Sequence, residues 1–424
     1  MDSKKYLDIN VYEAAQQRLK YIFEEFDNVL VAFSGGKDSG VLLNLAYEYA
    51  KKHGQLHKLG MYYLDYEAQY QLTIDYIQEM FDTFSDIKRY WLCLPVAVRS
   101  ATSITTTGTW IPWEKSKKDI WVRKMPDAEY VINEDNVPWK YKPGSRTYRL
   151  KKDFTQWFSS KYGKTAFLIG IRADESYDRF RAIKSDNKVN TYKDKEYIVG
   201  KNDIAFNAYP IYDWSVKDIW ICNGKMGFKY NELYDLYYQA GMSISSMRVA
   251  SPFLSYGLKN LHYYKVIDPD MWSKMIGRVN GVNFAGIYGS TSAMGWKDIK
   301  LPDGMTWKKY LKFLLSSLPE QSRKAYKKIF KTSIESWDKN GSVLDDETIQ
   351  EIKDVGIPLE IEGKHSKKAV EPVKKFSIMT LYKQMCVTIM KNVHTDSAKY
   401  MGAARTKEQS RKRQKSIKKY SDLL

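Results

Sequence analysis

The chain has 424 residues, of which 43% are hydrophobic, so it can bury a large core and form more than one domain at about 100–200 residues each. Its formal net charge of +18 predicts a polyanionic partner such as nucleic acid or a phosphorylated ligand. The three cysteines are widely spaced, which argues against a disulfide framework and against a zinc or iron–sulfur site. No run reaches the about 18–20 apolar residues of a membrane span, and no signal-peptide layout is present. These features predict a cytoplasmic protein.

The first half of the chain alternates helix-like and strand-like segments. Residues 11–26 place apolar side chains at helical spacing, and residues 28–33 form a short β-branched run typical of a buried strand. Strand candidates at residues 59–67 and 87–96 flank an amphipathic pattern at residues 73–84. Strands that alternate with helices predict an α/β domain with a parallel sheet covered on both faces.

Residues from about 100 to 145 interrupt this alternation with Thr, Gly, Pro, Trp and Lys in no clear period. A segment of this length without regular structure inside a domain is usually functional or disordered. Four tryptophans argue against disorder: Trp110, Trp113, Trp121 and Trp139. Because a helical pattern resumes after this segment and a strand pattern follows, we expect a Trp-rich insertion over one edge of the same sheet.

The second half of the chain is mostly helical in its periodicity. We expect an α/β domain over residues 1–225, a helical domain over residues 226–364, and a basic helical segment with a tail over residues 365–424. The last 20 residues hold eight Lys or Arg against two acidic residues. Such a run is either a solvated or disordered tail or a contact to nucleic acid, and both alternatives stay open.

The turn between the first strand and the next helix reads Ser-Gly-Gly-Lys-Asp-Ser at residues 34–39. Gly35 and Gly36 allow backbone N–H groups to approach a phosphate, and the N-terminus of the helix adds unpaired donors and a positive dipole. The hydroxyl groups of Ser34 and Ser39 are further donors. The turn therefore predicts a phosphate-binding loop.

The two charged residues of this turn indicate which type of phosphate-binding loop it is and which bond of the ligand is cleaved. A Walker loop has Ser or Thr after its lysine, whereas Lys37 is followed by Asp38. A carboxylate beside a phosphate is repulsive unless a cation lies between them, so Asp38 predicts bound Mg²⁺. We therefore expect a nucleoside triphosphate that is cleaved between its α and β phosphates, with Lys37 stabilising the leaving pyrophosphate.

With these residues the turn resembles the pyrophosphate loop of the ATP pyrophosphatase (PP-loop) superfamily, Ser-Gly-Gly-x-Asp-Ser after a first strand. "LDYEAQY" at residues 64–70 and "GIRADESYDRFRA" at residues 170–182 are similar to the phosphoadenosine-phosphosulfate reductase-like branch. The resemblance covers about residues 28–220. It implies a parallel-sheet fold of the adenine nucleotide alpha hydrolase type.

Two acidic residues follow the second strand. Asp65 and Glu67 emerge at its carboxyl end, where ligands of open α/β sheets bind, and can accept hydrogen bonds from ribose or adenine. The alternative is that each is a surface carboxylate with no ligand role.

The late stretch adds Gly170 and a group of arginines to the predicted nucleotide site. Arg172, Arg179 and Arg181 surround Glu175 and offer guanidinium forks suited to phosphate or sulfate oxygens. We predict a catalytic role for Arg172 together with the lysine and aspartate of the loop. A structural Arg–Glu network is the alternative.

Two further stretches resemble a narrower bacterial subfamily. The Trp-rich insertion and "YNELYDLYYQAGMSISSMRVASPF" at residues 230–253 look like the immunoglobulin-binding regulator A type, which carries an added C-terminal domain of unknown function. This resemblance implies a ParB-like protein partner.

The sequence lacks the nucleophilic cysteine motif of a sulfonucleotide reductase. Such an enzyme uses a cysteine near its C-terminus in a Glu-Cys-Gly-x-His context, and this chain lacks that motif. Cys93 and Cys386 lie in apolar runs and are expected to be buried. Reduction is then possible only with a thiol from a partner, and none of the five histidines lies in a motif that marks a general base.

The sequence therefore predicts an ATP-binding protein that cleaves ATP between the α and β phosphates, as an adenylyltransferase or a hydrolase, with a ParB-like partner and on or near nucleic acid. The alternative is a nucleotide-sensing, DNA-binding regulator without turnover. The basic C-terminal half would contact the nucleic acid in either case.

Overall fold

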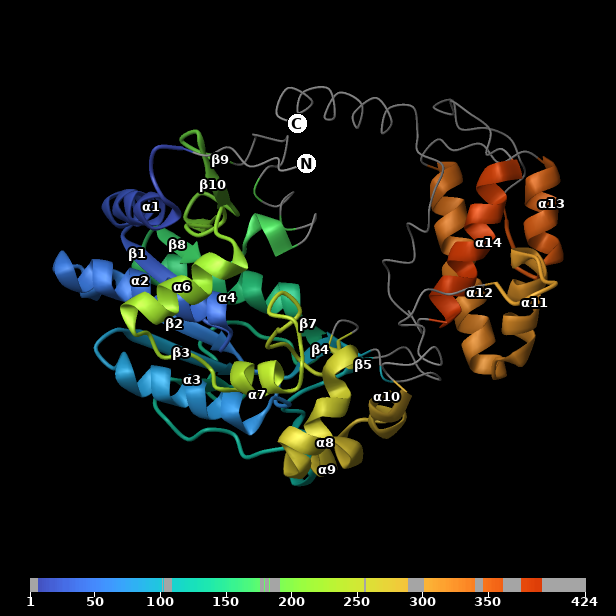
Figure 1. Ribbon diagram of the computed structural model, residues 1–424, viewed down its shortest axis with the longest axis horizontal. Helices are drawn as coiled ribbons and strands as arrows, with labels where there is room; N and C mark the ends of the chain where they lie inside the picture. Colours follow the sequence, from blue (N-terminus) through green and yellow to red (C-terminus); the bar gives the residue numbers. More distant parts are fainter. Residues whose placement is uncertain are drawn as a thin grey trace.

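The computed structural model describes residues 7–100, 102, 109–175, 179, 183, 191–254, 257–288, 301–339, 346–360 and 375–390. Up to residue 288 these segments form an α/β domain, and from residue 301 onward they form a helical bundle (Figure 1). Each of the two has its own hydrophobic core.

An eight-stranded sheet forms the centre of the α/β domain, in the order β6-β3-β2-β1-β8-β11-β10-β9. The six strands from β6 to β11 are mutually parallel, and β10 and β9 continue the sheet as antiparallel strands. The bounds are β1 (Asn28–Ala32), β2 (Leu59–Leu64), β3 (Lys88–Cys93), β6 (Val131–Asn133), β8 (Thr165–Leu168), β9 (Thr191–Tyr192), β10 (Lys195–Gly200) and β11 (Ala205–Ala208). The predicted α/β class with a mostly parallel sheet is confirmed, whereas the antiparallel edge was not predicted.

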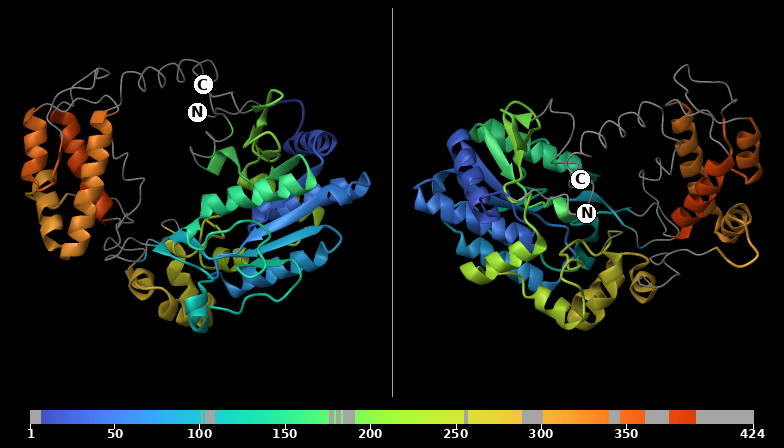
Figure 2. Two further views of the ribbon diagram at one scale, coloured as in Figure 1. Left: turned by 180° about the vertical axis from the view of Figure 1, so that it is seen from behind. Right: turned by 45° about the horizontal axis from the view of Figure 1, so that its top comes forward.

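Helices cover both faces of this sheet (Figure 2), and the side chains of β1 alternate between them. Val29 and Val31 pack into one core and Leu30 into the other. The first core includes α1 (Val11–Glu25), α2 (Lys37–Lys52), α3 (Gln71–Thr83) and α6 (Val216–Met226). The second includes α4 (Thr147–Tyr162), α7 (Leu233–Gln239), α8 (Tyr264–Ile267), α9 (Pro269–Arg278) and α10 (Val282–Tyr288).

The strand order reverses at β1, because β2 and β3 lie on one side of it and β8 and β11 on the other. In open α/β sheets such a reversal leaves a crevice at the carboxyl ends of the two adjacent strands, where ligands bind. Residues 34–39 follow β1 and Gly170 follows β8. The fold therefore brings two of the predicted site stretches to the same edge of the sheet.

The Trp-rich insertion contributes strands to both sheets of the domain. Its strand β6 pairs with β3 and forms the edge of the main sheet, which agrees with the predicted position. A three-stranded sheet joins β4 (Val96–Arg99) to β5 (Thr109–Trp110) and β7 (Ser145–Arg146). In the chain, a 3₁₀ helix, η2 (Lys115–Ile120), follows β5 and precedes β6. Trp113 is 1% exposed, so the insertion has a buried anchor.

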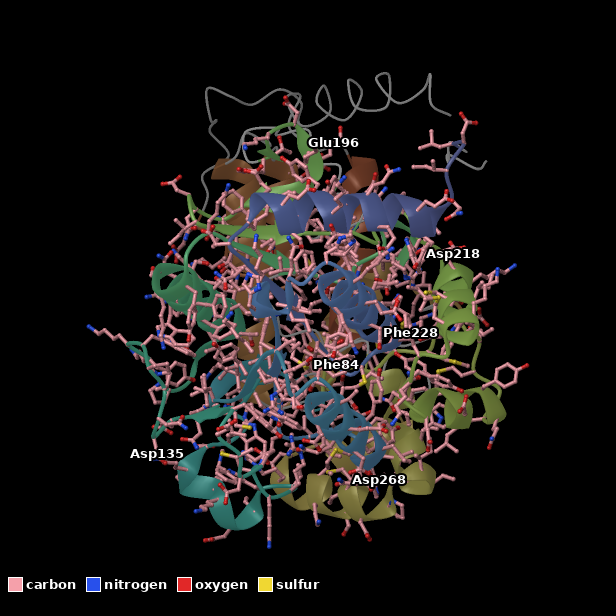
Figure 3. The ribbon with its side chains drawn as sticks, turned by 90° about the vertical axis from the view of Figure 1, so that its left-hand side faces the viewer. Phe84, Asp135, Glu196, Asp218, Phe228 and Asp268 are labelled. Carbon is pink, nitrogen blue, oxygen red and sulfur yellow. The ribbon has the colours of Figure 1, made fainter. Side chains whose placement is uncertain are left out.

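The α/β domain does not end at the predicted boundary. Residue 225 falls within α6, and the second core continues through Tyr234, Phe253 and Tyr264. Asp268, labelled in Figure 3, caps α9 by accepting from the Met271 amide and also accepts from the Gln71 amide at the start of α3. The segment after α6 is thus packed and hydrogen-bonded to the sheet domain.

Four helices form the bundle, among the residues described after 300: α11 (Trp307–Ser317), α12 (Glu320–Lys339), α13 (Asp346–Asp354) and α14 (Lys375–Met390). Leu311, Phe330, Ile352 and Met385 share its core. The predicted boundary at residue 365 would separate α14 from the other three helices, although α14 packs with them. Residues 391–424, including the basic tail, lie outside the described residues. In the described part of the chain no helix has the length and apolar character that a bilayer span requires.

Candidate nucleotide site

The loop at residues 34–39 is closed by its own hydroxyl groups. The amide of Ser34 donates to Ser39 Oγ at 3.1 Å, and Ser39 Oγ donates to the Gly36 carbonyl at 3.0 Å. Gly35 has φ +72°, and a Cβ there would lie 2.9 Å from the Ile77 side chain. Only glycine fits this backbone and this space.

Lys37 is held inside the site by contacts with three residues. Its side chain is 4% exposed, and its Nζ donates to the Met247 carbonyl at 3.2 Å and lies 3.4 Å from Asp38 Oδ2. The ring of Tyr234 lies 5.1 Å from the same Nζ, and the Tyr234 hydroxyl accepts from the Lys37 amide at 3.1 Å. Burial lowers the pKa of Lys37, and Asp38 opposes that shift.

Asp38 joins the loop to the stretch after β8. Arg172 Nε lies 2.5 Å from Asp38 Oδ1, while the other guanidinium nitrogens face Asp174 at 2.5 Å and Glu175 at 3.7 Å. A Cβ on Gly170 would lie 3.1 Å from the backbone of Asp38, so the two stretches are in close contact. The structure therefore brings together the three residues that the sequence predicts as catalytic.

The remaining residues of the late stretch are only partly placed. Glu175 forms an ion pair with Arg179 as well as with Arg172. Arg181 lies outside the described residues. An Arg–carboxylate network thus exists here, and contact of these arginines with a ligand stays a prediction.

Asp65 is fully buried and bound by protein groups. Its Oδ2 accepts from Trp91 Nε1 at 2.7 Å and pairs with Arg123, and its Oδ1 accepts from the Glu67 amide at 2.8 Å. These contacts give the carboxylate a structural role in the described conformation. The predicted contact to ribose or adenine stays a prediction, and the surface alternative does not describe this residue.

Glu67 has the same character and connects three parts of the chain. It is fully buried, with φ +66°, and accepts from the amides of Trp113 and Val122 in the insertion at 2.7 and 3.1 Å. Arg278 of α9 donates to both carboxylate oxygens, at 2.9 and 3.2 Å. The predicted ligand role of Glu67 likewise stays a prediction. In the structure, its hydrogen bonds connect the insertion and α9 to the end of β2.

The sequence did not indicate the basic partners of these carboxylates. Arg123 and Arg278 lie 58 and 211 residues from the acidic residues that they bind. No local pattern links residues at such distances. The tertiary fold alone brings them together.

The cysteines are buried, as the sequence predicted for Cys93 and Cys386. Burial raises the pKa of Cys222 to about 11 and of Cys386 to about 12. Burial and the nearby Asp65 raise the pKa of Cys93 well above its usual range. All three cysteines of the chain lie in described segments, and at each of them burial disfavours the thiolate that a nucleophile needs.

A resident metal site requires more ligands than the loop provides. Among the described residues no group of three or more His, Cys, Asp or Glu is arranged to hold a metal ion. Asp38 offers one carboxylate, and it faces two cationic side chains. Mg²⁺ is commonly held by one or two carboxylates together with substrate phosphates. The site therefore fits Mg²⁺ only as an ion that arrives with a phosphorylated ligand.

A parallel sheet with a Ser-Gly-Gly-Lys-Asp-Ser turn at its switch point defines a nucleotide-binding protein of the PP-loop class. Residues 28–241 match the phosphoadenosine phosphosulfate reductase domain, and residues 241–412 match a domain of unknown function, DUF3440. The chain belongs to the phosphoadenosine phosphosulfate reductase domain family.

Known proteins are similar to this chain over much of its length. The uncharacterized protein YbdN of Escherichia coli (strain K12) is 36% identical over 326 residues, which cover 76% of this chain and 78% of YbdN. The phosphoadenylyl-sulfate reductase of Candida auris, solved with phosphate, is 15% identical with a TM-score of 0.30, and the match covers 59% of this chain and 91% of that one. The FMN adenylyltransferase of Candida glabrata, solved with FAD and pyrophosphate, is 14% identical with a TM-score of 0.33, over 54% of this chain and 64% of that one.

Proposed function

We propose that this protein binds ATP in the crevice between β1 and β8 and cleaves it between the α and β phosphates. The observation that carries the proposal is the convergence of Lys37, Asp38 and Arg172 beside the first turn of α2. A helix N-terminus and two cations favour a polyphosphate at this position. Membership in a family named for a phosphorylated adenosine supports an adenine nucleotide as the ligand.

In the proposed reaction an oxygen nucleophile attacks the α-phosphorus. The bond between this phosphorus and the bridging oxygen breaks, and pyrophosphate leaves with the electron pair of that bond. With water as the nucleophile the products are AMP, pyrophosphate and a proton, whereas an acceptor hydroxyl group would become adenylated.

The residues of the chain have separate roles in this reaction. Lys37 and the amides of the loop bind the charge that develops on pyrophosphate. Asp38 orients Lys37 and Arg172, since it contacts both side chains. Mg²⁺ that enters with the nucleotide would neutralise phosphate charge, and Asp38 would be its protein ligand.

The test is a turnover assay with Mg²⁺ and ATP labelled at the α-phosphate, with and without DNA or RNA. We expect labelled AMP and free pyrophosphate from the wild type and neither from Asp38→Ala. Asp75→Ala, which removes an exposed carboxylate of α3, is the matched control and should keep full activity. Tight ATP binding without cleavage under every condition would contradict the enzymatic proposal.

A nucleotide-sensing DNA-binding regulator is the second candidate, supported by the net charge of +18. It predicts DNA binding whose affinity falls steeply with salt, because bound cations release counterions from DNA. The ParB-like partner implied by resemblance belongs in both assays as an added component. A flat salt dependence would argue against the regulator.

Sulfonucleotide reduction is the least favoured function. It needs a thiolate that attacks sulfur, and burial raises the pKa of each cysteine of this chain. A partner would have to supply the thiol. Product formation from phosphoadenosine phosphosulfate by the purified chain with a small thiol reductant would overturn this ranking.

A further inference from the structure

The segment after α7 reaches back to the loop at residues 34–39. Met247 is 2% exposed, and its carbonyl accepts from Lys37 Nζ at 3.2 Å. Met247 lies within the match to the domain of unknown function, beyond the reductase domain match that ends at residue 241. The family-specific part of the chain thus contacts the lysine of the candidate nucleotide site directly.

The next residue, Arg248, is a cation without a carboxylate partner among the described residues. Arg172 and Arg278 are buried and each faces at least one carboxylate. Arg248 is half-buried and makes neither an ion pair nor a hydrogen bond within that part of the chain. A partly desolvated guanidinium next to a buried lysine is unfavourable unless an anion compensates it.

The electrostatics of Lys37 agree with this geometry. Burial is the largest cause of its lowered pKa, and Arg172 and Arg248 add to the shift because both carry the same charge. Asp38 is the carboxylate that opposes the shift. An incoming phosphate would relieve the repulsion among these three cations.

Arg248 also lines a small cavity of about 30 Å³ with Tyr70, Tyr237, Tyr264, Ser246 and Asn260. Tyr264 is 2% exposed, and its hydroxyl group has no hydrogen-bond partner among the described residues. The volume admits one or two water-sized groups, since a water needs at least about 10–15 Å³. The cavity is therefore too small for a base, and the polar side chains in its mixed lining, Arg248 above all, suit an oxygen of a phosphate group.

We propose that Arg248 is a specificity-determining residue of the nucleotide site, contributed by the segment that follows the reductase-type domain, and that it binds a terminal phosphate group of an adenine nucleotide. This group is either the γ-phosphate of ATP or a phosphate on the ribose 3′ oxygen. The inference rests on the proposed nucleotide binding and specifies how the ligand is selected.

Calorimetric titration of the full chain tests this inference. The ligands are AMP, ADP, adenosine 3′,5′-bisphosphate and an ATP analogue with a methylene bridge between the α and β phosphates. We expect Arg248→Ala to weaken binding of the ligand with the matching terminal phosphate by about 10–100-fold, as for loss of a charge-assisted hydrogen bond. AMP binding should change less than about threefold, and Arg248→Lys should restore part of the loss.

Titrations with the different ligands distinguish the two phosphate positions. A loss confined to the ATP analogue assigns Arg248 to the γ-phosphate, and a loss confined to the bisphosphate assigns it to the 3′-phosphate. Arg323→Ala in α12 is the matched control and should bind every ligand as the wild type does. If Arg248→Ala fails to fold, Arg248→Gln takes its place in the same titrations.

Loss of nucleotide binding as a whole and loss of the Arg248 contact alone give different results in these titrations. A wild-type chain that binds none of these nucleotides overturns the proposed function and this inference together. A wild-type chain that binds, alongside an Arg248→Ala variant with unchanged affinity for every ligand, overturns the inference and leaves the proposed function intact.

Discussion

Two groups of charged residues follow neighbouring parallel strands, and they differ in how completely the protein satisfies them. After β1, Lys37 and Asp38, the β1 group, face Arg172 and the edge of the sheet, and Asp38 keeps 15% of its side chain exposed. After β2, Asp65 and Glu67, which with their arginine partners form the β2 group, are fully buried. Both groups contain acids and bases at the carboxyl edge of one sheet, where ligands of such folds bind.

The two groups differ in whether other parts of the chain balance their charges. The insertion and α9 supply donors to every carboxylate oxygen of Glu67. Near Lys37, in contrast, Arg248 adds a further cation without a carboxylate partner in the described residues. Position at a strand end therefore does not by itself assign a ligand role, and the proposed ligand role of the residues near Lys37 rests on the additional cation.

The largest effect should come from breaking the buried pair of Glu67 and Arg278. Arg278→Met leaves the Glu67 carboxylate buried without its cation, so we expect a loss of about 3–5 kcal/mol in the free energy of unfolding. Urea unfolding measures it. The double variant Glu67→Gln, Arg278→Met should lose less than Arg278→Met alone, because no uncompensated charge remains.

The matched control for this variant is an exposed pair. Arg149→Met breaks the ion pair of Arg149 with Asp153 on α4, where the arginine is 61% exposed, and should cost at most about 1 kcal/mol. Equal losses for Arg278→Met and Arg149→Met would contradict the structural role assigned to the β2 group.

Lys37→Met should separate binding from stability at the β1 group. We expect nucleotide affinity to fall by about 10–150-fold, the range for loss of a charged hydrogen bond, while Lys52→Met at the other end of α2 leaves affinity unchanged. Stability should fall little or rise, since the buried ammonium is costly to desolvate. Calorimetric titration and urea unfolding give the two quantities.

The lowered pKa of Lys37 predicts how the difference in stability between the wild type and Lys37→Met changes with pH. The pKa of Lys37 is lowered by burial in the folded state, so between that pKa and its value in the unfolded chain the unfolded state binds more protons. The stability of the wild type relative to Lys37→Met should therefore rise with pH in that window. A relative stability that falls with pH there would mean that the ammonium is stabilised in the fold.

Gly170→Ala should have a smaller effect on the same site. The added Cβ would lie 3.1 Å from the backbone of Asp38, so the start of α2 must shift away from β8. We expect a destabilisation of about 1–3 kcal/mol and weaker nucleotide binding. Gly224→Ala in α6 is the control, because no atom lies within 4 Å of its added Cβ, and it should stabilise by about 0.5–1 kcal/mol.

The smallest perturbation is alkylation of the cysteines. Cys93 lies 3.6 Å from Asp65 and its pKa is raised by burial, so iodoacetamide at pH 8 should not modify it in the native protein. In Arg278→Met the same thiol should react faster, because opening of the β2 group exposes it. Mass spectrometry of the modified peptides follows both rates, and equal protection in the two proteins would show that Cys93 does not report on this group.

The sequence predicted the parts of the fold that have local signals. A β-branched run, a glycine pair and a helical period locate β1, the loop and α2, and alternation of elements predicts the parallel sheet. The antiparallel strands β9 and β10 lie in a polar stretch without such a signal. The packing of α7 to α10 on the sheet was not predictable either, because a helical period does not say which core its apolar face joins.

The candidate site shows the same division. The residues at 34–39 were recognisable because their spacing carries a chemical role in itself. Arg278 and Arg248 were not, since Arg278 pairs with a carboxylate, and Arg248 interacts electrostatically with a lysine, more than 200 positions away. Burial, which gives Asp65 its contacts with protein groups in the described conformation, is likewise a property of the folded chain.

The most direct test of the contrast between the two groups is a crystal structure of the protein with Mg²⁺ and the methylene-bridged ATP analogue. We predict that the phosphates lie on the loop at residues 34–39 within reach of Lys37 and Arg248, and that Asp65 and Glu67 keep their present partners. A nucleotide that binds elsewhere, or that displaces Arg278 to contact Glu67, would contradict the account.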